Sequence, residues 1–278
     1  MVMKARSAPL IPAIVLSWDR NRIFVEHMVR RYAVEWPGHP FEFHIPFQEN
    51  DGPVAGARCR MIKTPPDIVN TVLTLLSGFS ADTWVYWCID DKYPLWLDTP
   101  FIARVARVVE TRELSQVDGV LFSRVGPDRV ESASAEALRE VPKDPGNAGL
   151  GHLLLRHDWS RIWIHQFIRV GVLRALFAAM PRDLGQAKDM DEAKKLIPLP
   201  AGARLTLTRE SHAVFGESAS RGVITEGCLA SLRALRMETP PVNVTPAPGI
   251  QRGHPVRPEH PWQWLTPRFL RAYRAGFT

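Results

Sequence analysis

The chain has 278 residues, of which 45% are hydrophobic and 23% are charged, a composition typical of a globular protein with a substantial core. Its formal net charge of +6 favours an anionic partner: a nucleotide phosphate, a nucleic acid or an anionic membrane surface. The three cysteines form no C-x-x-C pair, so neither a zinc site nor a disulfide framework is indicated and we expect a cytoplasmic setting. No apolar run approaches the roughly 20 residues of a membrane span.

The first 125 residues alternate between strand patterns and helix patterns. The β-branched, apolar segment 13–17 predicts a buried strand. Segment 20–36 places an aromatic residue or Met at every fourth position, which predicts a helix with one apolar stripe. Alternating Phe and Ile residues in 41–47 predict the next strand. Further strands are predicted at 58–64, 84–89 and 118–125, and further helices at 64–78 and 98–109.

This alternation predicts an α/β fold in which a doubly wound, mostly parallel sheet is flanked by helices. In such sheets, ligands bind beyond the carboxyl ends of the strands. Ser17, Asp19 and Arg20 follow the first predicted strand. Asp90 and Asp91 follow a central one. We therefore expect both acidic features at the same edge of the sheet.

The second half of the chain is less regular. Short strands are predicted in HLLLRH, RIWIHQ and ARLTLT, at 152–157, 161–166 and 203–208, and helices at 169–180 and 225–236. From residue 239 prolines recur, and the chain ends in an aromatic, basic segment that could pack on the domain, touch a membrane surface or bind a partner. We expect one domain over residues 1–238 and a proline-rich extension over residues 239–278.

Two acidic clusters are candidates for chemistry. Asp90 and Asp91 are suitable ligands for Mn²⁺ or Mg²⁺, although one of them could instead cap a turn while the other is solvated. A carboxylate can also act as a general base that removes a proton from a hydroxyl, and the cluster Asp189, Asp191 and Glu192 offers such a base. Alternatively, this second cluster is only the solvated start of a helix, where acids are favourable.

The segment ESHAVFGESASRG, at 210–222, is the third candidate. It combines His212, Glu217 and Arg221 with small residues and two glycines, and is predicted to be a polar loop that follows a strand. Such a loop could contact a phosphate or a sugar through Glu217 and Arg221, and His212 could bind a metal or a phosphate. A structural turn with a surface histidine is the alternative.

Three segments together resemble a group of bacterial and viral glycosyltransferases of the GT-A fold. They are SWDRNRIFVEHMVRRYAVEWPGHPFEFHIPF at 17–47, YWCIDDKYPL at 86–95, and FIRVGVLRALFAAMP followed by AKDMDE within 167–192. The resemblance extends over about residues 10–235. It implies that a sugar moves, with inversion, from a nucleoside-diphosphate donor to a hydroxyl of a glycan, a lipid-linked saccharide or a small molecule.

The resemblance also implies roles for matching residues. Ser17, Asp19 and Arg20 would contact the nucleotide, whereas Asp90 and Asp91 would hold the ribose or sugar and the divalent cation. Asp191 matches the catalytic base best, with Glu192 and Asp189 beside it. His212 would be a late metal ligand together with Asp91. The family's Asp-x-Asp triplet reads Asp90-Asp91-Lys92 here, so Lys92 could stabilise the diphosphate in place of a metal.

Two other functions remain open at this point. A nucleotidyltransferase can have a similar sheet with metal-binding carboxylates, but it releases pyrophosphate instead of a nucleoside diphosphate. A non-enzymatic, basic nucleic-acid or membrane-surface protein would rely on the arginine-rich C-terminal segment. No nucleic-acid-binding motif occurs, so a nucleic-acid partner is not expected. The sequence also contains no Walker phosphate loop and no G-x-G-x-x-G motif.

Overall fold

The computed structural model describes residues 10–239, apart from 124–149 and the positions 57, 112–113, 115, 151–152, 157, 160, 183, 185–186, 209–210 and 221–222. The expected extension over residues 239–278 lies outside the described residues except for its first residue. Arg221, expected to bind the nucleotide sugar, also lies outside them.

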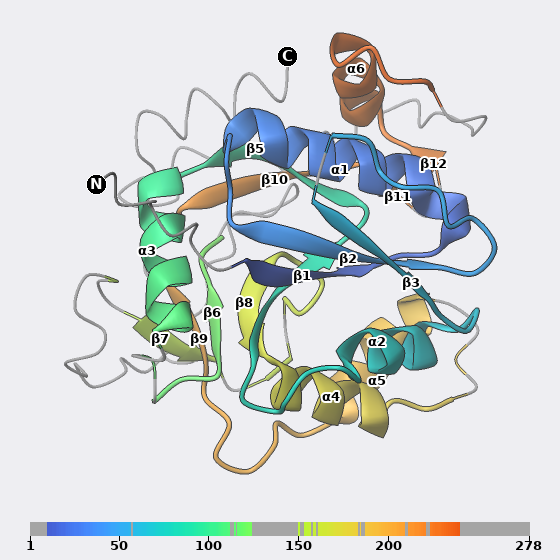
Figure 1. Ribbon diagram of the computed structural model, residues 1–278. Coiled ribbons are helices and arrows are strands. Elements are labelled where there is room, and N and C mark those ends of the chain that lie inside the picture. The colour runs from blue at the N-terminus through green and yellow to red at the C-terminus, as the bar shows by residue number, and fades with distance from the viewer. Residues whose placement is uncertain are drawn as a thin grey trace, which may run out of the picture.

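An eight-stranded sheet runs through the molecule (Figure 1). In spatial order its strands are β3 (Cys59–Lys63), β2 (Phe41–Phe47), β1 (Ile11–Leu16), β4 (Trp84–Ile89), β8 (Gln166–Arg169), β6 (Gly119–Leu121), β9 (Leu205–Thr208) and β7 (Leu153–Arg156). Strand β8 is antiparallel to both neighbours and β7 is antiparallel to β9, whereas all other pairings are parallel. The predicted mostly parallel sheet is therefore confirmed.

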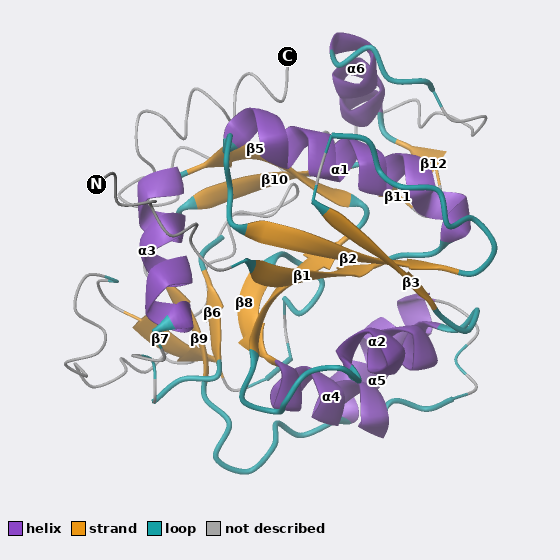
Figure 2. Ribbon diagram, in the orientation of Figure 1, coloured by secondary structure: helices purple, strands orange, loops and turns teal. Residues whose placement is uncertain are grey.

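Helices cover both faces of this sheet (Figure 2). One face carries α1 (Arg22–Glu35) and α3 (Thr99–Glu110), and the other carries α2 (Ile68–Leu76), α4 (Val170–Ala179) and α5 (Ala187–Leu196). In β4, Trp84, Tyr86 and Cys88 pack into the core on the α1 side, and the intervening residues pack into the core on the α2 side. A strand buried on both faces needs an unbroken apolar run, which explains the sequence WVYWCI. Among the described helices, none is long and apolar enough to span a bilayer.

A small antiparallel sheet lies beside α1. It pairs β5 (Lys92–Leu97) with β10 (Ala213–Glu217), and Arg31 of α1 donates a hydrogen bond to the carbonyl of Pro94 at 3.1 Å. The prediction of a loop over 210–222 is therefore wrong for most of that segment. A short hairpin of β11 (Ala219–Ser220) and β12 (Val223–Ile224) then leads into α6 (Glu226–Ala234).

Glycine at position 216 allows β5 and β10 to pair closely. A Cβ atom on Gly216 would lie 2.5 Å from Cζ of Tyr93, whose ring is buried against His27 with 4.3 Å between ring centroids. We expect Gly216→Ala to lower the free energy of unfolding by about 1–3 kcal/mol, because the rigid ring has no room to shift. Urea denaturation measures the change. Gly78→Ala, where nothing lies within 4 Å of the new Cβ, is the control, and an equal loss in both variants would contradict the prediction.

Several predicted element boundaries need correction. Helix α2 begins after Asp67, whose side chain accepts a hydrogen bond from the Asn70 N–H at 2.8 Å, and not after Thr64 as the sequence suggested. The strand predicted over 161–166 is wrong, because 161–164 form a turn and only Gln166 belongs to β8. Arg161 has a φ of 61°, a left-handed conformation that lies outside the β region of regular strands. The N-caps Asp98 and Thr225 agree with the predicted helix starts.

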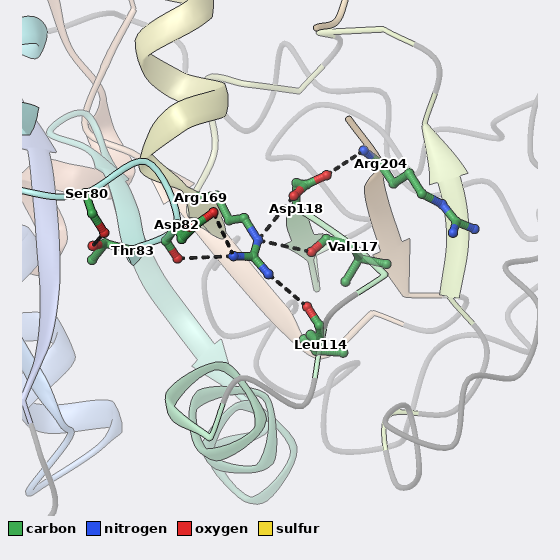
Figure 3. A network of polar contacts seen from close by, with 8 residues as sticks. All are labelled: Ser80, Asp82, Thr83, Leu114, Val117, Asp118, Arg169 and Arg204. Atoms are coloured by element: carbon green, nitrogen blue, oxygen red, sulfur yellow. Dashed lines mark hydrogen bonds and ion pairs between the residues drawn. The ribbon is translucent and has the colours of Figure 1, made fainter. Parts of the chain in front are cut away.

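Arg169, the last residue of β8, connects the amino ends of several strands through an ion pair and hydrogen bonds (Figure 3). Its Nε lies 3.1 Å from Oδ1 of Asp118, just before β6. Its guanidinium also donates to the carbonyls of Asp82 and Leu114, at 3.2 and 3.1 Å. Asp118 in turn accepts a hydrogen bond from the Arg204 backbone N–H, just before β9, at 2.9 Å. This network is at the sheet edge opposite the acidic residues and is structural.

Candidate functional site

The order of the strands changes direction beside β1. Strands β2 and β3 lie on one side of β1, while β4, which comes next in the chain, lies on the other. The carboxyl ends of β1 and β4 therefore form a topological switch point, where α/β sheets bind ligands. Oγ of Ser17, directly after β1, donates a hydrogen bond to Oδ2 of Asp90, directly after β4, at 2.7 Å. The structure thus brings together two residues that the sequence predicted at the same edge.

Asp90 is buried, with 6% of its surface exposed. Its Oδ2 also accepts a hydrogen bond from the amide of Asn21, at 2.9 Å. Burial raises the pKa of Asp90 to about 7, and the neighbouring charge of Asp91 adds to this effect, while the hydrogen bonds from Ser17 and Asn21 oppose it. Asp90 therefore changes its protonation state near neutral pH. Its capacity to accept hydrogen bonds from a ligand, or to donate one to it, changes at the same time.

Asp19 organises the loop that follows β2. Its Oδ2 accepts hydrogen bonds from the backbone N–H groups of Gln48, Glu49 and Asn50, at 3.1, 2.7 and 3.1 Å. Burial raises the pKa of Asp19, but these three hydrogen bonds and the charge of Arg22 outweigh that effect, so its pKa is lowered. The structure places Asp19 at the predicted edge, with Oδ2 committed to shaping the loop.

Gln48 connects the same loop to two further strand ends. Its Oε1 accepts a hydrogen bond from the backbone N–H of Asp19, and its Nε2 donates one to Oγ1 of Thr64, directly after β3. The carboxyl ends of β1, β2 and β3 are thus joined by polar contacts into a continuous rim. Nothing in the local sequence around Gln48 indicates this role.

An aromatic and cationic surface lies beside this rim. The guanidinium carbon of Arg20 is 3.4 Å from the centroid of the Trp18 ring, and Arg20 is exposed. A stacked arginine on tryptophan presents a flat, positively charged surface that suits an aromatic base or a phosphate. The sequence selected Arg20 for nucleotide binding but did not identify Trp18 as its stacking partner.

Lys92 bridges two carboxylates that come from distant parts of the chain. Its Nζ lies 2.6 Å from Oε1 of Glu217 and 3.2 Å from Oδ1 of Asp91. The antiparallel register of β5 and β10 places Lys92 opposite Glu217, and the backbone N–H of Ser218 donates to the Asp91 carbonyl at 2.6 Å. Burial lowers the pKa of Lys92, but the two carboxylates outweigh this effect and raise it above its usual value, so the amine is protonated.

These residues do not fit a divalent cation at Asp91. The position between the carboxylates of Asp91 and Glu217 is held by the Lys92 ammonium, and Oδ2 of Asp90 already accepts two hydrogen bonds. Over the described part of the chain, no three His, Cys, Asp or Glu residues are grouped so as to hold a metal ion. The residue types alone suggested a metal site, but their arrangement does not support one.

His212 is not brought to this site. It precedes β10, whose last residue is Glu217, and so lies at the opposite end of the strand. Its Nδ1 is 2.9 Å from Oδ2 of Asp98, and its ring stacks on Phe101 with 3.5 Å between centroids. Because β10 is an extended strand and not the predicted loop, His212 and Asp91 lie at opposite ends of the β5–β10 sheet. The prediction that they share a metal ion is corrected by this placement.

The acids of α5 differ from one another in their surroundings. Oδ1 of Asp191 accepts a hydrogen bond from Nε1 of Trp163 at 2.9 Å and pairs with Nζ of Lys194 at 2.5 Å. Burial raises the pKa of Asp191, but these two partners outweigh that effect and lower it. Glu192 pairs with Lys195 at 2.8 Å on the exposed side, and Asp189 is exposed.

Trp163 connects Asp191 to the carboxyl edge of the sheet. It lies three residues before Gln166, which pairs with Trp87 near the carboxyl end of β4. Nε1 of Trp87 donates a hydrogen bond to the carbonyl of Ile162, which fixes the turn at this edge. Among the α5 acids, Asp191 is therefore the one tied to the segment beside Asp90. No pattern around Trp163 in the sequence indicates this contact.

A buried chain of hydrogen bonds ends directly beside Asp90. Nε2 of His165 lies 3.0 Å from the carbonyl oxygen of Ile89, and a carbonyl only accepts, so Nε2 carries the proton. Burial lowers the pKa of His165 to about 3, with a smaller effect of Lys92, so the ring is neutral and Nδ1 accepts from the Tyr32 hydroxyl at 2.6 Å. The Tyr32 oxygen in turn accepts from the Tyr86 hydroxyl at 2.7 Å. This chain holds the carboxyl end of β4 in place.

Comparisons with known proteins give only distant likenesses. No protein-family model matches the sequence. A search of curated proteins also found no match.

Among solved structures, the chain is similar to S. aureus TarS 1–349, with 12% identity and a TM-score of 0.43 over 74% of this chain and 60% of that one. It is also similar to 2-C-methyl-D-erythritol 4-phosphate cytidylyltransferase from Thermus thermophilus, with 15% identity and a TM-score of 0.42 over 81% of this chain and 98% of that one. A third likeness is to the galactosyltransferase LgtC in complex with donor and acceptor sugar analogues, with 13% identity and a TM-score of 0.34 over 68% of this chain and 67% of that one. Identities this low, with TM-scores below 0.5, assign no function to this chain.

Proposed function

We propose that this protein is a glycosyltransferase that moves a sugar from a nucleoside-diphosphate donor to the hydroxyl of an acceptor. The observation that carries the proposal is the hydrogen bond between Ser17 and Asp90, which joins the two strand ends at the switch point of the sheet. A ligand at this position meets carboxylate, amide and hydroxyl groups together with two cations, Arg20 and Lys92. Hydroxyl-rich sugars linked to a diphosphate match that set of groups.

The donor would bind along the rim formed by the ends of β1 and β4. Asp90 is placed to hydrogen-bond ribose or sugar hydroxyls, and the stack of Arg20 on Trp18 offers a surface for the base. Lys92 supplies a positive charge for the diphosphate at the start of β5. Seven residues expected from the sequence to bind the nucleotide sugar lie at the carboxyl ends of β1 and β4 or at the paired ends of β5 and β10: Ser17, Asp19, Arg20, Asp90, Asp91, Lys92 and Glu217.

The acceptor would be activated by Asp191. Its carboxylate is ionised at neutral pH, and Oδ2 has no hydrogen-bond partner among the described residues, so it is open to an acceptor hydroxyl. In the proposed step, the acceptor oxygen bonds to the anomeric carbon while the bond from that carbon to the diphosphate oxygen breaks. The proton passes to Asp191 and the nucleoside diphosphate leaves, which inverts the anomeric centre.

A panel of nucleotide sugars tests this function directly. Each donor is incubated with the protein, thermal stabilisation is recorded, and the released nucleotide is identified. We expect stabilisation by at least one donor and release of its nucleoside diphosphate. Release of pyrophosphate from a nucleoside triphosphate would instead identify a nucleotidyltransferase. Salt-sensitive binding to nucleic acid or anionic vesicles that survives Asp90→Asn, with no response to any donor, would identify a binding protein.

Replacement of Asp191 with Asn should lower kcat by about 10²- to 10⁴-fold with a donor that the panel identifies, because the amide cannot take the acceptor proton. The KM for the donor should stay within about twofold, because Asp191 is assigned to the acceptor. Steady-state kinetics at saturating acceptor measure both values. Asp82→Asn, at the opposite edge of the sheet, is the matched control and should leave kcat unchanged. If Asp191→Asn kept full kcat, the base would have to be sought at Glu192 or Asp189.

A further inference from the structure

We propose that the ammonium of Lys92 serves as the built-in cation of this site, so that a nucleoside diphosphate binds there without a divalent metal ion. This inference rests on the proposed function, in which the same edge of the sheet holds a nucleotide sugar. The residue types of the acidic motif suggested Mn²⁺ or Mg²⁺. The arrangement of Asp91, Lys92 and Glu217 indicates instead that the Lys92 ammonium takes the place of such an ion.

The geometry of this cluster is that of an occupied cation site. Asp91 and Glu217 are the two carboxylates that would face a metal ion, and Nζ of Lys92 lies between them at 3.2 and 2.6 Å. The side chain of Lys92 is only 12% exposed, so the amine is held within the protein and does not extend freely into solvent. A divalent ion at the same place would have to displace a positively charged group from both of its partners.

Backbone pairing fixes this arrangement. Lys92 and Glu217 face each other in the β5–β10 ladder, and the Ser218 N–H binds the Asp91 carbonyl at 2.6 Å. The bulge between Val214 and Phe215 lies farther along the ladder and leaves the pairing at Lys92 regular. This backbone pairing keeps Asp91, Lys92 and Glu217 next to one another.

Lys92 still has capacity for a ligand. An ammonium has three N–H donors, and among the described residues Nζ donates a hydrogen bond to Glu217 and forms an ion pair with Asp91. The third N–H is available to a phosphate oxygen. One ammonium cannot balance two carboxylates and a diphosphate, so the exposed guanidinium of Arg20 at the same edge provides a second positive charge.

Two measurements test the inference. First, Mn²⁺ alone is titrated by calorimetry into wild type, Lys92→Met, Lys92→Arg and Lys195→Met. Lys195 also pairs with a carboxylate, Glu192, but on the exposed side of α5, so it is the matched control. We expect Lys92→Met to bind Mn²⁺ at least tenfold more tightly than wild type, because it removes the ammonium from between the carboxylates of Asp91 and Glu217. Lys92→Arg and Lys195→Met should behave as wild type.

Second, a panel of nucleoside diphosphates is titrated into the wild type, once with EDTA and once with Mn²⁺. The wild-type Kd for the nucleotide that binds should differ by less than about twofold between the two conditions, and Lys92→Met should bind it at least tenfold more weakly in EDTA. Mn²⁺ binding by wild type as tight as by Lys92→Met, or a tenfold loss of wild-type affinity in EDTA, would overturn the inference.

The two titrations separate the inference from the proposed function. If no nucleotide of the panel binds in either condition, the proposed function fails, while the Mn²⁺ titration still decides whether Lys92 excludes the metal. Circular dichroism shows whether Lys92→Met folds. If it does not, the two wild-type titrations and Lys92→Arg decide whether the site binds a nucleotide without a metal ion. Mn²⁺ binding to wild type would then refute the inference, and its absence together with nucleotide binding in EDTA would support it.

Discussion

Replacing Asp90 with asparagine should make the protein more stable than the wild type at pH 8, and this gain should shrink as the pH falls towards 4. The pKa of Asp90 is raised to about 7 in the folded protein, against 3.8 for an unperturbed group. Between these values the folded state binds more protons than the unfolded state, so wild-type stability falls as the pH rises through that window. Asparagine carries no charge to bury and lacks this dependence.

The difference in unfolding free energy between Asp90→Asn and wild type should therefore grow by on the order of 2 kcal/mol from pH 5 to pH 8. Urea denaturation across this range measures it. Asp19→Asn is the control at the same edge of the sheet, because the pKa of Asp19 is lowered and the group stays ionised throughout. That variant should be destabilised by a constant amount. A constant difference for Asp90→Asn as well would mean that Asp90 ionises normally.

Replacing Arg169 with methionine should cost about 2–4 kcal/mol of unfolding free energy without affecting ligand binding at the other edge of the sheet. Arg169 lies 3.1 Å from Oδ1 of Asp118 and donates to carbonyls in two loops (Figure 3). Methionine preserves much of the side-chain volume but removes the guanidinium from Oδ1 of Asp118 and from these carbonyls, while Oδ2 of Asp118 keeps the Arg204 N–H. The variant isolates the contribution of the guanidinium.

Arg169→Lys tests the same point with the charge retained. One ammonium cannot reach all the acceptors that the planar guanidinium serves, so we expect a loss intermediate between wild type and Arg169→Met. Arg30→Met, on the exposed side of α1, should change stability by less than about 0.5 kcal/mol. Equal stabilities of Arg169→Met and Arg30→Met would show that the network contributes nothing. Chemical denaturation at one pH measures all three variants.

The architecture could be predicted from the sequence because it is encoded in local patterns. The period of the apolar residues distinguishes strand 41–47 from helix 22–35, and the unbroken apolar run at 84–89 indicates a strand that is buried on both faces. Because β1 and β4 are parallel neighbours, the residues that directly follow them, Ser17 and Asp90, must lie at the same edge of the sheet. Their juxtaposition therefore followed from topology alone.

The partners of the site residues could not be predicted, because they depend on contacts between distant segments. Lys92 meets Glu217 only because β10 is antiparallel to β5, and a polar segment with two glycines indicated a loop instead of a strand. The same error placed His212 near Asp91. Similarly, the contact between Asp191 and Trp163 depends on a turn in which Arg161 has a positive φ, and no periodicity encodes such a turn.

The pairing of β5 with β10 also determines when the site can form during synthesis. Lys92 and Glu217 are separated by 125 positions in the chain, so β5 lacks its partner strand β10, and Lys92 lacks Glu217, until almost all of the described chain has left the ribosome. The Ser17–Asp90 half of the site forms earlier, because its last supports in the chain are His165 and strand β8. A chain cut before β10 would retain that half while exposing an unpaired strand edge that is prone to aggregation. The proposed activity should therefore appear only late in synthesis, and fragments that end before residue 213 should have none.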